Sequence, residues 1–176
     1  MQEAENVREM PDDEIAETGE AVRAPTDEWT AAALAHASVL LTLALGAAGG
    51  IGVPVGLAVP LAMYLGYREK SRFVAFHALQ SFVYQSAGLL IYVVVAAALG
   101  VWVTMAWNVS AWLAAVLIGL LMMPFALLLT LLMVLVLVGA PIAWLGYGLY
   151  AAYKVYQGSN FHYWLIGERL EKEVKA

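Results

Sequence analysis

The stretch from Ala111 to Tyr153 contains no charged residue. A helix needs about 20 apolar residues to cross the hydrocarbon core of a bilayer, so this run is more than long enough for one span. Hydrophobic residues make up 62% of the 176 positions and charged residues only 13%. Soluble domains average roughly 45–50% apolar and about 25% charged residues. The sequence therefore predicts an all-α fold, a polytopic membrane helix bundle.

Four transmembrane helices are expected from the apolar runs. The first three are predicted at Thr30–Gly46, at about Ile51–Tyr67 and at about Ala75–Met105, with a turn at Trp107–Ser110 before the fourth. Residues 111–153 are long enough for one helix or for two short ones, because Pro124 and Pro141 both offer breaks. Composition alone leaves this choice open.

Charge placement favours four spans over five. All nine Lys and Arg lie in the N-terminal tail, in the loop Arg68–Arg72, or from Lys154 onward. With four spans every basic residue falls on one side of the membrane, as the positive-inside rule requires, whereas five spans would move Lys154 and the basic residues after it to the opposite side. We therefore predict that both termini are cytoplasmic. Arg68, Lys70 and Arg72 would then form an amphipathic cytoplasmic elbow that can meet anionic lipid headgroups.

The chain divides into three predicted regions. Residues 1–28 contain ten of the fourteen acidic residues and two of the nine basic ones, a net charge of −8, and are predicted to be a disordered tail. Residues 29–158 form the four-span bundle, and residues 159–176 form a cytoplasmic segment at the interface. The tail is either a solvated segment that opposes aggregation or a docking arm for a basic partner.

A stripe of polar side chains occupies the start of the third predicted span. Its members recur at spacings of three and four and therefore share one helix face: His77, Gln80, Ser81, Tyr84 and Gln85. His36 in the first span lies at a comparable depth if both helices begin at the same interface. Polar side chains at membrane depth normally face other helices or a cavity, so we expect the stripe in the interior.

Three interpretations of this stripe remain open. It can supply hydrogen bonds between helices, line a polar groove for a substrate, or ligate haem or a metal through His36 and His77. No carboxylate accompanies the histidines to orient their rings, and the chain has no cysteine. We expect no cofactor and no metal.

Three stretches carry a resemblance to a known family: LAHASVL (Leu34–Leu40), VPLAMYLGYREKSRFVAFHALQSFVYQ (Val59–Gln85) and LYAAYKVYQGSNFHYWLIG (Leu149–Gly167). They resemble a family of small, uncharacterised bacterial four-span membrane proteins, which is similar to the protein-import channel component of the chloroplast inner envelope. Beside the charged elbow Arg68–Arg72, the family's marks fall on His36, Pro60, Phe76, His77, Gln80, Tyr153 and Gly158. Trp164 stands where a proline is expected. The resemblance implies a four-helix fold in the bacterial cytoplasmic (inner) membrane and no settled activity.

No catalytic motif such as HExxH, GxSxG or a P-loop is present in the sequence. We therefore expect a non-enzymatic protein, a scaffold or accessory subunit of a larger membrane complex. Its expected partners are the lipid bilayer and other integral membrane subunits, and not nucleic acid. The alternative is a channel or protein-translocation component with a polar groove lined by the His77 stripe.

Overall fold

The computed structural model describes residues 26–47, 52–164, 166–167 and 170, and all regular elements in these residues are helices. The all-α prediction is therefore confirmed. The helices are α2 (Thr26–Ala37), α3 (Val39–Ala47), α4 (Gly52–Tyr67), α5 (Arg72–Ala114) and α6 (Ile118–Tyr156). Of the predicted tail, residues 1–25 lie outside the described residues, and residues 26–28 form the first turn of α2.

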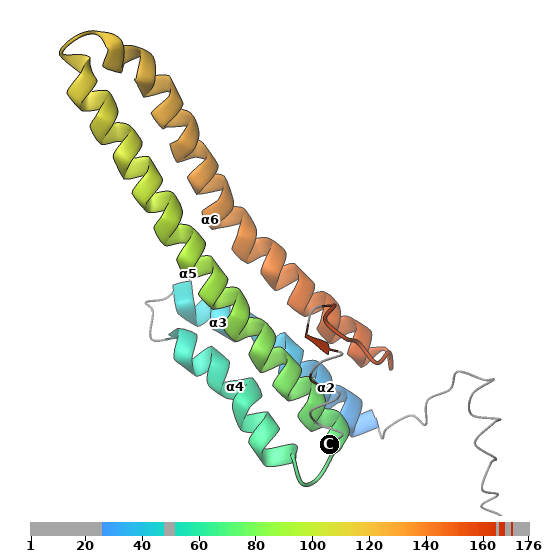
Figure 1. Ribbon diagram of the computed structural model, residues 1–176. Coiled ribbons are helices and arrows are strands. Elements are labelled where there is room, and N and C mark those ends of the chain that lie inside the picture. Colours follow the sequence, from blue (N-terminus) through green and yellow to red (C-terminus); the bar gives the residue numbers. More distant parts are fainter. Residues whose placement is uncertain (1–25, 48–51, 165, 168–169, 171–176) are drawn as a thin grey trace, which may run out of the picture.

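A long hairpin of α5 and α6 dominates the molecule and extends well past the three shorter helices (Figure 1). At 1.5 Å per residue, the 43 residues of α5 correspond to about 65 Å and the 39 residues of α6 to about 59 Å. Each helix is therefore about twice as long as the ~30 Å hydrocarbon core of a bilayer. These two helices are long and apolar enough to cross a membrane, and α4 is a shorter apolar helix.

The shorter helices pack around one half of this hairpin. Helix α3 packs on α4, α4 packs on α5, and α2 contacts both α5 and α6. Gly56 of α4 permits a close approach to α3, since a Cβ atom there would lie 2.6 Å from the Thr42 nitrogen. We call this half the base of the bundle and the opposite half the outer hairpin.

The turn of the hairpin does not lie at Trp107–Ser110, and that prediction was wrong. Helix α5 continues to Ala114 because the polar groups of this stretch find partners on the hairpin itself. The Asn108 side chain donates to the Thr104 carbonyl at 2.8 Å, and Trp107 Nε1 donates to Thr130 Oγ1 at 3.0 Å. The chain instead reverses between Ala114 and Ile118.

The run that could hold one helix or two forms a single helix after this turn. Helix α6 begins at Ile118 and contains both Pro124 and Pro141. The prolines are accommodated within the helix, so neither one marks a turn between two spans.

The predicted first span is divided in two at Ser38. The Ser38 hydroxyl donates to the Ala35 carbonyl at 2.7 Å, and the Leu41 N–H donates to the Ser38 carbonyl at 3.0 Å. Serine side chains that bond to a nearby carbonyl compete with the regular helix ladder. The break therefore separates α2 from α3 where the sequence predicted one continuous helix.

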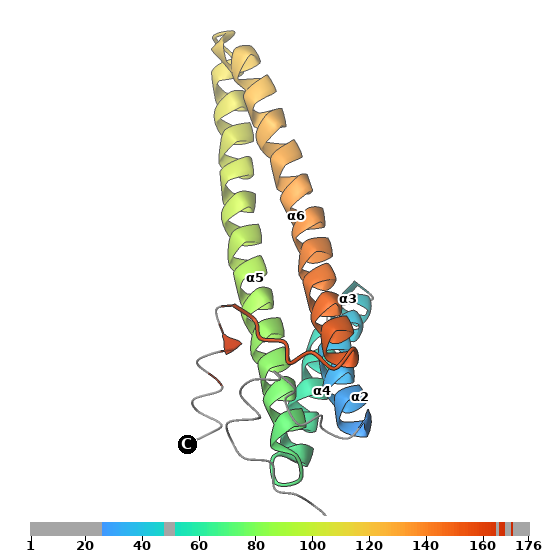
Figure 2. The same ribbon diagram turned by 90° about the vertical axis from the view of Figure 1, so that its right-hand side faces the viewer.

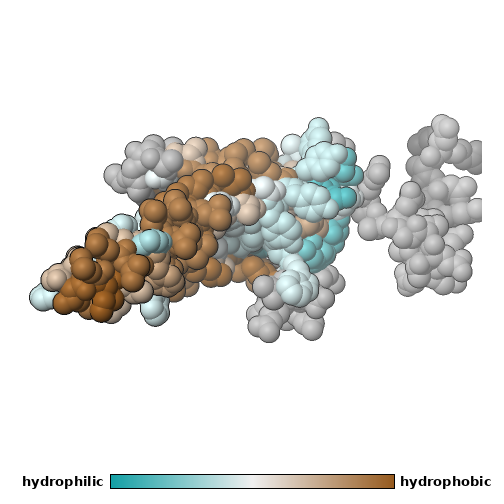
Figure 3. All heavy atoms as spheres, turned by 90° about the horizontal axis from the view of Figure 1, so that it is seen from above, coloured by the Kyte–Doolittle hydropathy of each residue, from teal (hydrophilic) through white to brown (hydrophobic). Residues whose placement is uncertain are grey.

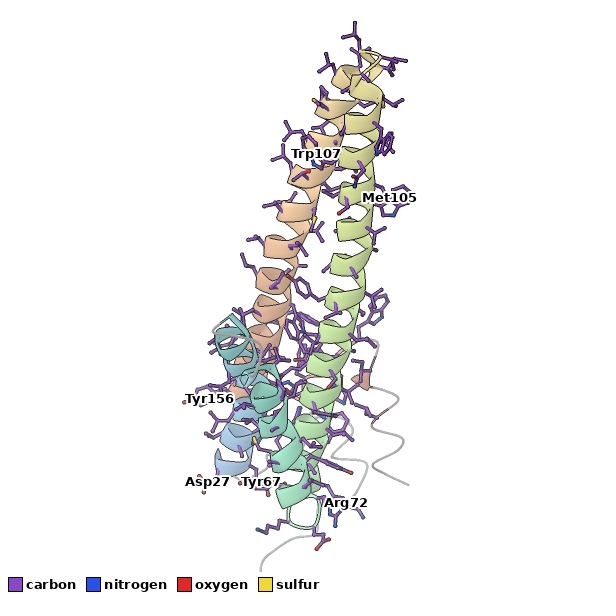
Figure 4. All side chains as sticks on the ribbon, turned by 90° about the vertical axis from the view of Figure 1, so that its left-hand side faces the viewer. Asp27, Tyr67, Arg72, Met105, Trp107 and Tyr156 are labelled. Carbon is purple, nitrogen blue, oxygen red and sulfur yellow. The ribbon has the colours of Figure 1, made fainter. Side chains whose placement is uncertain are left out.

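Charge and apolar surface separate along the long axis of the molecule. Apolar side chains cover the outer hairpin, and hydrophilic ones gather at the base (Figure 3). Asp27, Tyr67 and Arg72 lie at the base, whereas Met105 and Trp107 lie toward the hairpin turn (Figure 4). The side chains of Arg68, Lys70 and Arg72 are exposed, as an elbow that meets headgroups requires.

Candidate functional site

The base of the bundle encloses a cluster of polar side chains. Each of them is at most 4% exposed, and we call them the polar cluster: His36, Ser38, Thr42, His77, Gln80, Ser81, Gln85 and Tyr163. They come from α2, from α3, from the first part of α5, and from the segment that follows α6. Helical spacing accounts for the contribution of α5, because residues three and four apart face the same neighbour.

A chain of three hydrogen-bonding groups crosses the cluster. His36 Nε2 lies 3.2 Å from His77 Nδ1, and His36 Nδ1 lies 3.2 Å from the Tyr163 hydroxyl. If the Tyr163 hydroxyl donates to His36 Nδ1, then His36 Nε2–H donates to His77 Nδ1. The tautomers of the two imidazoles are therefore coupled, since the proton in each bond fixes the role of the next ring nitrogen.

Gln85 connects α5 to the break between α2 and α3. Its carboxamide oxygen accepts from Thr42 Oγ1 at 2.6 Å, and its nitrogen donates to Ser38 Oγ at 2.8 Å and Ser81 Oγ at 3.0 Å. Ser81 in turn donates to the Ala35 carbonyl at 2.7 Å. This carboxamide thus satisfies several polar groups that have no access to water.

A segment after α6 closes the cluster from outside. We call residues 158–164 the strap, and Figure 2 shows it running from the end of α6 across α5. The Gln80 carboxamide, assigned from its neighbours, accepts from the Tyr163 N–H at 2.9 Å and donates to the Phe161 carbonyl at 3.1 Å. One side chain of α5 therefore pairs with the strap backbone at two points.

Tyr84 lies at the edge of the cluster and is only partly buried. Its ring stacks on Tyr163 with centroids 4.1 Å apart and planes 5° from parallel. Its hydroxyl donates to the Trp144 carbonyl on α6 at 2.7 Å. Tyr84 thus joins α5, α6 and the strap.

Tyr163 was not among the candidate residues found in the sequence. Its signal there is the aromatic stretch FHYW that follows Gly158, a glycine with a left-handed φ of 80° that ends the helical path of α6. Burial raises the pKa of the Tyr163 phenol above its ordinary value, and the nearby Tyr84 and Tyr147 raise it further. The phenol therefore stays protonated and available as a donor at physiological pH.

The geometry bears on which chemistry the cluster can support. Two nitrogens that each lie about 2 Å from one tetrahedral metal ion are about 3.3 Å apart. The 3.2 Å between His36 Nε2 and His77 Nδ1 therefore fits a direct hydrogen bond and does not by itself exclude a shared ion. Among the described residues no three His, Asp or Glu side chains gather as a metal site would require.

The polar groups of the cluster bond to one another and to nearby backbone groups. The structure brings His36, His77, Gln80, Ser81 and Gln85 together in it, and it places Tyr84 beside them. The Arg68, Lys70 and Arg72 side chains remain outside it, on the exposed loop between α4 and α5 and at the first residue of α5.

Residues 27–170 match the family described as the magnetosome magnetite crystal formation protein family (MamF/MmsF). This match covers most of the chain, and the chain belongs to that family. Neither the curated proteins nor the solved structures contain a match. The membership agrees with the expected small bacterial membrane protein, but no link to the chloroplast import channel is shown.

Proposed function

We propose that this member of the magnetosome family is a non-enzymatic membrane protein that takes part in magnetite crystal formation as a packing element, that is, a scaffold or accessory subunit of a larger membrane complex. In this role it would pack against the lipid and the other membrane proteins around a crystal. It would lie in the bacterial cytoplasmic (inner) membrane, with both termini cytoplasmic. The family match supports the process, and the burial of the polar cluster supports the mode of action.

The observation that carries this proposal is the complete burial of the polar side chains at the base. His36, His77, Gln80 and Gln85 are 0% exposed, and this burial supports a role in packing. Their hydrogen bonds join helices and strap, as expected of groups that specify packing. The surface left for contact is the apolar exterior of the outer hairpin, where Trp112 is 83% exposed and Leu121 is 76% exposed.

The alternative is a channel or translocation component, in which the polar cluster would line the transported solute's path. This alternative is supported by the gathering of many polar side chains in one place between the helices. Channels select solutes through rings of carbonyl oxygens or charged side chains, and the described part of the bundle interior holds no charged ring. We therefore favour the packing role.

Genetic replacement in a magnetite-forming bacterium tests the process. Deletion of the gene should alter the size or number of crystals seen by electron microscopy, and the wild-type gene should restore them. Crystals unchanged by deletion would count against any role in their formation. A gene that lacks residues 1–24 tests, in the same strains, the basic partner proposed for residues 1–28. A gene that carries Arg68→Gln with Lys70→Gln tests the lipid contact of the elbow.

Two further replacements separate packing from transport. Thr42→Val and Ser81→Ala remove polar atoms from the cluster and change side-chain volume little. A packing element should still restore normal crystals with either gene. A channel lined by these groups should lose function, and purified protein in liposomes would then conduct iron(II) in a way that Thr42→Val abolishes.

A further inference from the structure

The strap (residues 158–164) is the outer wall of the polar cluster. The Tyr163 hydroxyl bonds to His36, and the Phe161 and Tyr163 rings both pack edge-on against the His36 ring, with centroids 6.3 and 5.5 Å away. His162 packs on Phe76, a ring that also contacts His77. The strap therefore covers both buried imidazoles, one from α2 and one from α5.

The strap has no helix or strand of its own and is held by side-chain hydrogen bonds and ring contacts, among them those of Phe161 with Tyr147 and Tyr150 of α6. Gln80 bonds to the strap backbone at Phe161 and Tyr163. His36 bonds to the Tyr163 hydroxyl, and Tyr84 stacks on the Tyr163 ring. No disulfide is available in a chain without cysteine. Segments without regular secondary structure open at a lower free energy than the core helices they cover.

The start of the strap has the geometry of a hinge. Gly158 adopts φ 80°, a conformation that glycine reaches without a steric penalty. Its N–H donates to the Val155 carbonyl, and the Ser159 N–H donates to the Lys154 carbonyl, so the end of α6 is capped before the strap begins. The helix can therefore stay intact when the strap leaves.

We propose that the strap is a releasable latch that closes the base of the bundle, and that its release exposes His36 and His77 to aqueous solution. The inference rests on the strap's contacts alone and is independent of any role in crystal formation. Release would remove the phenol from His36 Nδ1 and both backbone partners from Gln80. Two imidazoles and a carboxamide would then be available to solutes at the base of the bundle.

Histidine modification reports directly on this exposure, because the chain has only three histidines. Diethyl pyrocarbonate would be applied to the purified full-length protein in lipid nanodiscs, and each histidine followed by peptide mass spectrometry. Gln80→Leu removes both backbone bonds, and Tyr163→Ala removes the stack and the phenol. We expect either change to raise the modification rates of His36 and His77 at least about tenfold, which corresponds to ~1.4 kcal/mol in the opening equilibrium.

Trp164→Ala is the matched control, since this strap side chain is 86% exposed. It should leave the rates at His36 and His77 unchanged. Hydrogen–deuterium exchange of strap peptides should rise in Gln80→Leu, while exchange in α5 beyond Leu90 stays at the wild-type level and shows that the bundle remains folded. The proposal is overturned if the strap exchanges faster and His36 stays unreactive, if strap exchange does not change, or if Trp164→Ala has the same effect.

Discussion

His36 Nε2 lies 3.2 Å from His77 Nδ1, so two helices that begin 46 positions apart in sequence meet through a pair of ring nitrogens. The bond is buried, and we expect both rings to be neutral because burying an unpaired charge is costly. Bonds of this kind between membrane helices contribute about 0.6 kcal/mol on average and up to ~1.7 kcal/mol. The contact should therefore define how α2 meets α5 more than it stabilises the bundle.

A double-mutant cycle tests this estimate. The single changes His36→Leu and His77→Leu and their combination would be unfolded in mixed detergent micelles and followed by circular dichroism. We expect a coupling free energy of about 0.6 kcal/mol. A coupling of several kcal/mol would show that one ring is charged and that the description of a neutral pair is wrong. His77→Asp should destabilise more than His77→Leu, because it buries a carboxylate.

Gln85 is expected to matter more than either histidine. Gln85→Leu leaves the Thr42 hydroxyl without its acceptor, and a buried unsatisfied polar group costs about 1–3 kcal/mol. Ser38 and Ser81 keep their bonds to the Ala35 carbonyl. Adding Thr42→Val to Gln85→Leu should therefore recover part of the lost unfolding free energy in the same detergent assay. A double variant less stable than Gln85→Leu alone would contradict this account.

The sequence predicted some of these contacts and missed others for a physical reason. Spacings of three and four place His77, Gln80 and Gln85 on one face of a helix, because periodicity is a local property. The partners of Gln80 lie about eighty positions further along the chain, in a strap without helical period. No local pattern specifies such a contact, so Tyr163 was not recognised.

The position of the hairpin turn could not be predicted either. Polar residues signal a turn only when they have no partner in the helix, and Asn108 has one in the Thr104 carbonyl. The actual turn uses Leu117, a residue with no turn preference, in the left-handed conformation at φ 64°. The two long helices were recognised because their apolar composition is independent of where they end.

Glycine positions allow a matched pair of substitutions. A Cβ atom at Gly56 would meet the backbone of Thr42, whereas at Gly66 it would meet no atom within 4 Å. Gly56→Ala should destabilise the protein by about 1–3 kcal/mol, since α3 and α4 would have to move apart. Gly66→Ala should be neutral or stabilising by up to ~1 kcal/mol, because alanine favours the helix. Equal effects in detergent unfolding would contradict the close approach of α3 and α4.

Leu117 offers a substitution that should stabilise the hairpin. A residue with a Cβ atom in the left-handed region costs roughly 1–2 kcal/mol, and glycine avoids that cost. The Leu117 side chain is 71% exposed, so its removal loses little packing. Leu117→Gly should therefore raise the detergent-unfolding free energy, although glycine's freedom in the unfolded chain reduces the gain. Leu135→Gly, in the interior of α6 at a side chain that is 68% exposed, is the control and should be destabilising by about 1 kcal/mol.

Cysteine labelling of this cysteine-free chain tests the predicted membrane topology. Four spans with cytoplasmic termini place Pro54, at the start of α4, and Ala115, at the hairpin turn, outside, and they place Ser159 inside. A membrane-impermeant maleimide applied to intact spheroplasts should then label Pro54→Cys and Ala115→Cys but not Ser159→Cys. All three sites are exposed on the protein, so a difference in labelling reports the membrane and not burial.

Helix lengths make Pro54 the decisive position in that experiment. The 16 residues of α4 extend only about 24 Å, less than the ~30 Å hydrocarbon core, whereas α5 and α6 exceed the core about twofold. A bilayer that thins around α4 keeps Pro54 at the outer surface, and the four-span prediction then holds. Labelling of Ala115→Cys without Pro54→Cys would instead mean that α2, α3 and α4 enter and leave from the cytoplasmic side, and that only α5 and α6 cross. Labelling of Ser159→Cys from outside would contradict both arrangements, because the two of them keep the C-terminal strap in the cytoplasm.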